Sequence, residues 1–408
     1  MKQPVVFGTD RLEESSQFQT GRLTRKLNRR AHKSKRCLFD IDFMREPPKY
    51  IWVDALRAIA ILFVIAVHST GKSSDPTSST VVAFQYGQTG VQLFFLASAI
   101  TLCLSAASRE DEGSPLLAFY ARRYFRIAPL YYVGIVLYLV WSGVFEFHKT
   151  GRFEIGAQYT PWNIAANVLF FHGVYPPANN DIVPGGWSIG TEMIFYAMFP
   201  GLWQLLKGAG DRKQVWTFAL LCLLAISVDT GIKYLMNEDS RMNGFLYFNI
   251  GTQLPVFLMG MVYYRQMSAG RRISHPAAMF LIFLLGTLVA WHEDLFLLLP
   301  SLSALSFLGV IQIVKDADPT VLRFLQPIGR VSYSMYVFHF FVLDGLSGLV
   351  FRNSKISQVI GPDVSLISIF VGATVITFAI ANLTYRVIEK PFLAIGKRIF
   401  ESDNPMCL

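Results

Sequence analysis

The sequence predicts an all-α, polytopic integral membrane protein with about ten transmembrane helices. Of its 408 residues, 52% are hydrophobic and only 16% are charged. Apolar windows of about twenty residues recur along the chain, and a helix of this length crosses the hydrocarbon core of a bilayer. Nothing after residue 50 has the composition of an interdomain linker. We therefore expect one transmembrane domain over residues 50–395 rather than several soluble domains.

A basic segment precedes this domain. Residues 1–49 contain twelve Lys or Arg against six Asp or Glu, and the densest run is RLTRKLNRRAHKSKR at 22–36. We predict a disordered cytoplasmic tail that lies near anionic headgroups. Nucleic-acid binding, which the net charge of +9 also permits, is the less favoured alternative. No secretory signal peptide is recognisable ahead of the first apolar run, so we expect that run to remain as a span.

The cysteines indicate neither a metal site nor a disulfide framework. Cys37, Cys103, Cys222 and Cys407 lack the spacing of zinc ligands, and two of them lie inside apolar segments. We expect no metal and no bound cofactor.

The charged residues between the apolar windows predict the orientation of the chain. Lys and Arg are concentrated in the connections after the second, fourth, sixth and eighth windows, which the positive-inside rule assigns to the cytoplasm together with both termini. The seventh and eighth windows are separated only by WHED at 291–294, so they could form a tight hairpin or one interrupted helix. The predicted spans are residues 50–69, 87–106, 126–145, 187–206, 215–234, 246–264, 277–292, 295–314, 329–350 and 364–386.

The longest connection on the outer side runs from 146 to 186 and contains His172. Its partly apolar piece WNIAANVLFFHG, at 162–173, is too short to span. We predict an interfacial or re-entrant helix there, as a lid over an outward-facing site. At the other end of the chain, YRVIEKPF ends the last span with Arg386 and Glu389 able to pair, and residues 396–408 are expected to be a cytoplasmic tail.

The first span carries three ionisable residues that hydrocarbon disfavours. Asp54 and Arg57 have the i, i+3 spacing that lets a carboxylate and a guanidinium meet. From Arg57 to His68 an α-helix turns about 1100° and rises about 16 Å, so both side chains face one way. The pair Asp54–Arg57 is equally well explained as a structural ion pair. For His68, near the outer end of the span, we favour a functional role because intramembrane ionisable groups usually line a cavity.

Three further clusters interrupt the apolar pattern. Arg122, Arg123 and Arg126 lie within about one helical turn at the inner end of the third span, and their guanidinium groups suit phosphates. An ordinary positive-inside boundary is the alternative.

The other two clusters lie on the fourth and ninth spans. After a Pro-Gly-Gly break, Ser188 and Glu192 are i, i+4 partners, and Tyr196 continues their face. Glu192 has no basic partner in its own helix, which favours a site role. Ser332, Tyr336 and His339 share one face of another span, and such a seam often bonds neighbouring helices only.

Six of these segments together resemble the membrane-bound acyltransferase 3 family, bacterial enzymes that O-acylate surface polysaccharides and related glycans. They follow the family's order and are DALRAIAILFVIAVH, FFLASA at 94–99, RRYFR at 122–126, WSIGTE at 187–192, SYSMYVFH at 332–339 and YRVIEKPF at 385–392. The resemblance covers residues 50 to about 395. The chain departs from it at Ala99, where the family usually has glycine, and in its long basic tail.

The resemblance implies an O-acetyltransferase of the bacterial inner membrane. It implies cytoplasmic acyl-CoA as the donor, with acetyl expected and succinyl as the alternative, and a glycan or lipid-linked glycan at the outer face as the acceptor, such as exopolysaccharide or lipopolysaccharide. Arg122, Arg123 and Arg126 would bind acyl-CoA. His68 would be the general base on the acceptor hydroxyl, oriented or charged by Glu192, with a transient acyl-histidine as the competing version. The channel or supporting residues would be Asp54, Arg57, Trp187, Ser188, Tyr333, Tyr336 and His339.

Two functions of other classes stay open at this point. A transporter of a glycan intermediate or a small anion would also need charged residues in spans, but the internal repeat typical of transporters is not recognisable here. A non-catalytic membrane scaffold would leave the alignment of Arg57 with His68 unexplained.

Overall fold

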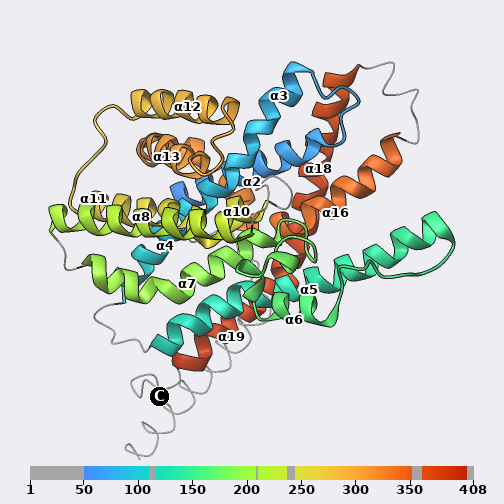
Figure 1. Cartoon of the computed structure of the whole chain (residues 1–408), viewed down its shortest axis with the longest axis horizontal. Coiled ribbons are helices and arrows are strands. Elements are labelled where there is room, and N and C mark those ends of the chain that lie inside the picture. The colour runs from blue at the N-terminus through green and yellow to red at the C-terminus, as the bar shows by residue number, and fades with distance from the viewer. Residues whose placement is uncertain (1–49, 110–115, 208–209, 237–243, 352–360, 402–408) are drawn as a thin grey trace, which may run out of the picture. The chain divides into compact units, whose positions relative to one another are not determined.

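A computed structural model describes residues 50–109, 116–207, 210–236, 244–351 and 361–401, and every regular element within them is helical (Figure 1). The predicted basic tail, 1–49, lies outside the described residues. The longer helices are α2 (Ile51–Thr70), α4 (Gly90–Ala107), α5 (Leu116–Thr150), α7 (Gly186–Lys207), α8 (Asp211–Met236), α11 (Ile250–Ser268), α12 (Pro276–His292), α13 (Leu299–Asp316), α16 (Ser332–Phe351), α18 (Pro362–Thr384) and α19 (Lys390–Glu401). The shorter ones are α3 (Ser79–Gln85), η1 (Tyr86–Thr89), α6 (Pro161–Val168), η2 (Phe171–Gly173), η3 (Pro176–Ala178), α10 (Phe245–Phe248), α14 (Pro319–Leu322), α15 (Gln326–Arg330) and η4 (Tyr385–Glu389).

Each predicted apolar window overlaps a helix. Among the described residues, six helical stretches have the length and apolar composition of a membrane span: Ile51–Thr70, Ser79–Ala107, Leu116–Thr150, Phe245–Ser268, Leu299–Asp316 and Pro362–Arg398. Two shorter apolar helices, Trp216–Ala225 and Pro276–His292, accompany them. The all-α, multi-pass membrane class is therefore confirmed, while the number of ten spans stays a prediction.

The segment at 291–294 connects two separate helices. α12 and α13 pack against each other along their length, and the hydroxyl of Ser306 donates a hydrogen bond of 3.1 Å to the carbonyl of Phe280 (Figure 1). Of the two possibilities left open by the sequence, the hairpin is the one that the fold adopts, with its turn extended to residue 298.

Helix α2 lies in the core, where it contacts α4, α13, α15, α16 and α18. Its residues Leu56, Ile61 and Ile65 are fully buried. α4 packs in turn on α11 across Gly260, whose position leaves no room for a side chain because an added Cβ would lie 2.8 Å from the Cβ of Ala99. The alanine found where the resembled family has glycine is thus accommodated by a glycine on the facing helix.

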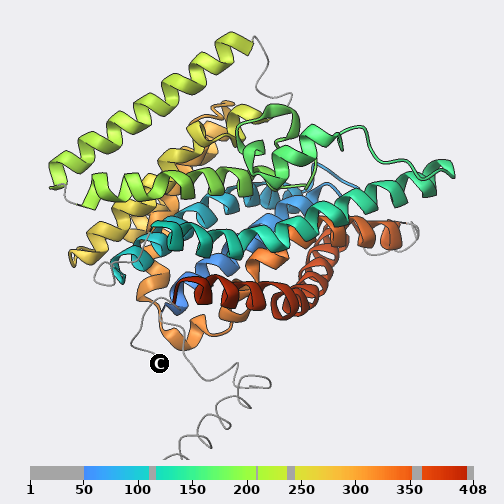
Figure 2. The same cartoon turned by 90° about the horizontal axis from the view of Figure 1, so that it is seen from below.

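Helix α5 is longer than the predicted window 126–145. Its 35 residues extend for about 52 Å, well beyond the roughly 30 Å of a hydrocarbon core, and continue through Pro129. The predicted arginine cluster therefore lies within the helix rather than at its start. α19 runs beside α5 (Figures 1 and 2), with Gly396 against Phe125, so the predicted boundary at 395 falls inside a helix that reaches Glu401.

The segment 146–186, which the sequence predicts to be on the outer side, contains only part of the predicted helix over 162–173. Helix α6 begins at a Thr160 cap, whose side chain accepts a hydrogen bond from the Asn163 amide, and it ends at Val168. Phe170 then adopts a left-handed conformation with φ of 58°, which stops the helix and reverses the chain. The following turn, η2, packs against α7.

Candidate active site

A small cavity of about 70 Å³ lies where α2, α4, α5, α7 and α16 meet. Its charged lining residues, among those described, are Arg57, Arg126 and Glu192, so the lining carries one positive charge in excess. The sequence predicted each of these residues separately as a site candidate, and the fold brings them together.

The carboxylate of Glu192 is held by two hydroxyl groups. Ser98 and Tyr196 each donate a hydrogen bond of 2.5 Å to its Oε1 atom, and the two hydroxyl oxygens lie 3.2 Å apart. The contact with Tyr196 follows from the i, i+4 face recognised in the sequence. Ser98 was missed as a site residue, although it lies within the FFLASA segment, because the pairing joins helices 94 residues apart.

The predicted pairing of Ser188 with Glu192 is wrong. The Ser188 hydroxyl donates to the hydroxyl of Tyr336 at 2.7 Å, and Tyr336 donates to the carbonyl of Gly185 at 2.9 Å. Gly185 has a φ of +79°, a conformation that glycine adopts at little cost, and it forms the break before α7. Ser188 therefore ties α7 to α16, and the carboxylate one turn further along turns to α4.

Two arginines surround Glu192 from different helices. Arg57 is bonded to Thr101 at 3.1 Å and pairs with Asp54 at 3.6 Å, so the predicted i, i+3 ion pair is confirmed. The guanidinium of Arg123 lies over the ring of Tyr196, 5.7 Å from its centre, and its Nε is buried without a hydrogen-bond partner in the described part of the chain. Both arginines interact electrostatically with the Glu192 carboxylate.

The three predicted phosphate-binding arginines do not converge on one cavity. Arg126 lines the small cavity, whereas Arg122 lines a second one of about 280 Å³ together with Arg109, Lys207 and Trp203. The reason is helical geometry, because Arg126 lies about 6 Å further along the axis than Arg122, and Arg123 points about 100° away from Arg122. The second cavity lies between α4, α5 and α7 and is also lined by Arg109 and Lys207, which the sequence analysis did not identify as site residues.

His68 does not line the cavity. Its ring centre is 5.3 Å from that of His339 and 4.2 Å from that of Phe340. Among the described residues no hydrogen bond joins His68 to Glu192, so the expected direct contact between them is not observed. His339 lies next to Tyr336, with ring centres 5.5 Å apart, and Tyr336 is the residue of this group that lines the cavity.

His339 presents one nitrogen with an unused lone pair. Its Nδ1 donates to the carbonyl of Tyr336 at 2.6 Å, which leaves Nε2 as the unprotonated nitrogen of the neutral ring. Nε2 is buried and has no hydrogen-bond partner within the described ranges. A buried acceptor of this kind is unusual and accompanies functional sites more often than other positions.

Other predicted residues have structural surroundings. Tyr333 lines the cavity and donates to the carbonyl of Ile127 at 2.8 Å. Trp187 is buried and stacks on Phe248, with ring centres 4.4 Å apart.

The predicted pair Arg386–Glu389 is replaced by a different contact. Glu389 accepts a hydrogen bond from Ser334, which in turn accepts one from Thr384 at 3.0 Å. The π-helical turn η4 (Tyr385–Glu389) redirects the Glu389 side chain from the helix surface to α16.

The predicted lid does not line the cavity. The segment 146–186 is fixed to the bundle by His172, whose Nε2 lies 3.0 Å from the carbonyl oxygen of Gly186 and 3.1 Å from the hydroxyl of Tyr131. Tyr131 also donates to Asn167 at 2.6 Å. The described lining residues include none from 146–186, so this segment supports the start of α7.

The described residues include no group of three or more His, Cys, Asp or Glu side chains placed to hold a metal ion. The cavity instead combines guanidinium groups, a fixed carboxylate and hydroxyl donors. Such a set can bind an anion or stabilise negative charge that develops on a carbonyl oxygen.

Comparison with known proteins gives one family and several relatives. The acyltransferase domain of the acyltransferase 3 type matches residues 50–386. The peptidoglycan O-acetyltransferase OatA of Listeria monocytogenes is 26% identical over 375 residues, which cover 84% of this chain and 56% of that protein. The Bacillus subtilis protein named "Putative peptidoglycan O-acetyltransferase YrhL" is 24% identical over 376 residues, covering 85% and 55%.

A third relative is similar. A protein of Staphylococcus aureus (strain COL), named "Putative O-acetyltransferase", is 26% identical over 380 residues, covering 84% of this chain and 57% of its own length. The chain thus spans little more than half the length of these relatives. No solved structure shows significant similarity.

Proposed function

The chain belongs to the acyltransferase 3 family, and on that premise we propose that it transfers an acetyl group from cytoplasmic acetyl-CoA to a hydroxyl of a glycan at the outer face of the bacterial inner membrane. The observation that carries the proposal is the partly buried Glu192 carboxylate, held by Ser98 and Tyr196 beside Arg57 and Arg126. A water-excluded site with fixed charges and hydroxyl donors suits acyl transfer, which develops negative charge on a carbonyl oxygen.

The donor enters from the cytoplasm in this proposal. With ten spans and both termini inside, the cavity lined by Arg109, Arg122 and Lys207 opens on the cytoplasmic side. These cations suit the phosphates of CoA, and the aromatic face of Trp203 suits its purine. The pantetheine arm then extends along α5 towards Arg126 and the small cavity.

The chemical step joins the acceptor oxygen to the acyl carbon. His68 removes the proton from the acceptor hydroxyl, whose oxygen attacks the thioester carbonyl carbon. Hydrogen-bond donors near His68 stabilise the resulting oxyanion, the carbon–sulfur bond breaks, and His68 returns its proton to the departing CoA thiolate. Arg57 lies about 16 Å from His68 along α2 and is too far away to contact the same oxygen. Glu192 orients the guanidinium groups rather than His68, because its described hydrogen bonds go to Ser98 and Tyr196.

Radiolabel transfer tests the proposal. Membranes containing the wild-type chain, His68→Ala or the control His292→Ala, an exposed histidine at the end of α12, are given labelled acetyl-CoA. Base catalysis typically contributes about 10² to 10⁴-fold, so we expect a loss of that size for His68→Ala and wild-type transfer for the control. Peptidoglycan is the first acceptor to test because two relatives are named for it, with exopolysaccharide and lipopolysaccharide beside it.

Two results would contradict the proposal. Folded His68→Ala protein with wild-type transfer would remove His68 from the chemistry. Wild-type membranes that transfer label to no glycan, from acetyl-CoA or succinyl-CoA, would favour a transporter instead.

A further inference from the structure

His68 on α2 and His339 on α16 bring their rings together where these two helices pack. The ring centres are 5.3 Å apart. His339 is fully buried, whereas His68 is partly exposed. The buried ring of His339 is thus placed to act on His68 rather than on a substrate.

The His339 ring is held in one tautomer. Its Nδ1 lies 2.6 Å from the carbonyl oxygen of Tyr336, and because a carbonyl oxygen only accepts, this nitrogen carries the proton. A second proton would create a buried charge, so the ring is neutral and Nε2 is an acceptor. Nε2 has no hydrogen-bond partner among the residues that the structure describes. A buried acceptor that lacks a donor destabilises the folded chain, and a donor that reached Nε2 would remove this cost.

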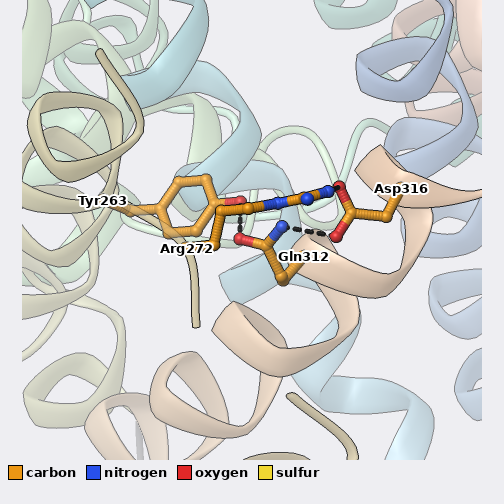
Figure 3. Close-up of polar contacts among 4 residues, drawn as sticks. All are labelled: Tyr263, Arg272, Gln312 and Asp316. Carbon is orange, nitrogen blue, oxygen red and sulfur yellow. Dashed lines mark hydrogen bonds and ion pairs between the residues drawn. The ribbon is translucent and has the colours of Figure 1, made fainter. Parts of the chain in front are cut away.

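A network between α11 and α13 shows how the same fold satisfies another buried polar side chain (Figure 3). Tyr263 donates to Oε1 of Gln312 at 3.2 Å, and Nε2 of Gln312 donates to Asp316 at 2.7 Å, so both ends of the buried amide are paired. The network ends at the exposed Arg272, 2.6 Å from the other oxygen of Asp316. His339 has only half of such an arrangement, since one ring nitrogen is paired and the other is not.

His68 is the neighbour that can supply the missing donor. Among the described residues, the rings in contact with His339 are those of His68, Tyr336 and Phe340. Tyr336 donates its proton to the carbonyl of Gly185, and Phe340 has no donor. The side chain of His68 makes no hydrogen bond within the described ranges, so its N–H is uncommitted.

The distance between the two rings fits such a hydrogen bond. Two imidazole rings joined by an N–H···N bond of about 2.9 Å have centres about 5 Å apart, because each nitrogen lies about 1 Å from its ring centre. The observed 5.3 Å therefore requires a change in the direction of a ring and no approach of the helices. Rotation of the His68 ring about its terminal torsion provides this change, since that torsion is broad in histidine.

We propose that His339 is a positioning residue for His68, whose N–H donates a hydrogen bond to His339 Nε2 during acetyl transfer. This inference rests on the proposed function, in which His68 is the general base. The hydrogen bond determines which His68 nitrogen bears the proton, so the other nitrogen is the free base that faces the acceptor hydroxyl.

The same hydrogen bond stabilises His68 while it is charged. When the acceptor O–H bond breaks, a new N–H bond forms on His68, and the imidazolium donates more strongly to His339 than the neutral ring does. The proton then leaves His68 for the CoA sulfur. His339 keeps its own Nδ1 proton throughout, so it neither gains nor loses a proton in the cycle.

Steady-state transfer from labelled acetyl-CoA to peptidoglycan by the full reconstituted chain tests the proposal. We expect kcat to fall by about 10 to 150-fold in His339→Leu, with the KM for acetyl-CoA unchanged. His339→Gln should lose less, because its amide oxygen can accept in place of Nε2. A packing role alone predicts the opposite order, since leucine suits an apolar environment better than glutamine does.

Two further variants separate this role from packing and from independent catalysis. Phe338→Leu reduces packing at the neighbouring buried position of α16 without removing an acceptor, so it should keep the wild-type kcat. His68→Ala/His339→Leu should be no slower than His68→Ala, because His339 acts only through His68. Thermal unfolding is measured for every variant, so that a loss of kcat is assigned only to folded protein.

The outcomes that overturn the proposal are distinct from those that overturn the proposed function. A wild type that transfers no acetyl group would overturn both. An active wild type in which His339→Leu is as fast as His339→Gln, or in which the losses from His68 and His339 multiply, would overturn the positioning role of His339 alone.

Discussion

Removing the two hydroxyl groups that hold Glu192 should reduce acetyl transfer more than either removal alone. In Tyr196→Phe the ring remains under Arg123, 5.7 Å from its guanidinium, and only the donor to Glu192 Oε1 is lost. A hydrogen bond to a charged group contributes about 1.5 to 3 kcal/mol. If the transition state loses this whole contribution, the rate of acetyl transfer should fall by about 10 to 150-fold.

Ser98→Ala should have an effect of similar size, because Ser98 and Tyr196 each donate one hydrogen bond of 2.5 Å to the same oxygen. In the double variant Oε1 loses both donors while the carboxylate remains partly buried between α4 and α7. We therefore expect the combined loss to exceed the product of the single losses by a coupling of about 0.5 to 3 kcal/mol.

The assay is initial-rate acetyl transfer from acetyl-CoA by reconstituted protein, with thermal unfolding measured for every variant. Tyr120→Phe is the matched control, since its hydroxyl also donates to α7, at the carbonyl of Ala197, but outside the cavity. Losses that simply multiply would show that the two donors act independently. A loss in Tyr120→Phe equal to that in Tyr196→Phe would refute the reasoning entirely.

Two further predictions concern stability. Burial lowers the pKa of His172 to about 4. Above the ordinary histidine pKa of 6.5 the ring is neutral in both the folded and the unfolded chain, and the segment 146–186 has its full stability. As the pH falls from 6.5 towards 4, the folded state should lose up to about 3 kcal/mol, because only the unfolded chain binds the proton. Hydrogen exchange at 160–186 should increase over this window in the wild type but not in His172→Gln, and pH-independent exchange in the wild type would contradict the assignment. Gly329→Ala should destabilise the bundle strongly, since its added Cβ would lie 1.8 Å from the carbonyl oxygen of Asp54. Gly286→Ala, with 3.6 Å to its nearest neighbour, should stabilise α12 by up to about 1 kcal/mol, and equal unfolding temperatures of the two variants would exclude this packing argument.

Local patterns in the sequence determined the helices and the contacts within them. The ten apolar windows all overlap helices, and the ion pair of Asp54 with Arg57 and the contact of Glu192 with Tyr196 follow from spacings of three and four residues. The reason is that an α-helix fixes the relative direction of side chains within one or two turns. The motif order was similarly sufficient for the family.

Contacts between helices were decided by the tertiary structure alone. Ser98 meets Glu192, Ser188 meets Tyr336, and His339 lies beside His68, although these partners are far apart in sequence. Such pairings depend on how far each helix is rotated and shifted against its neighbours. That rotation and shift are set by the packing of many apolar side chains together, so no single motif contains them.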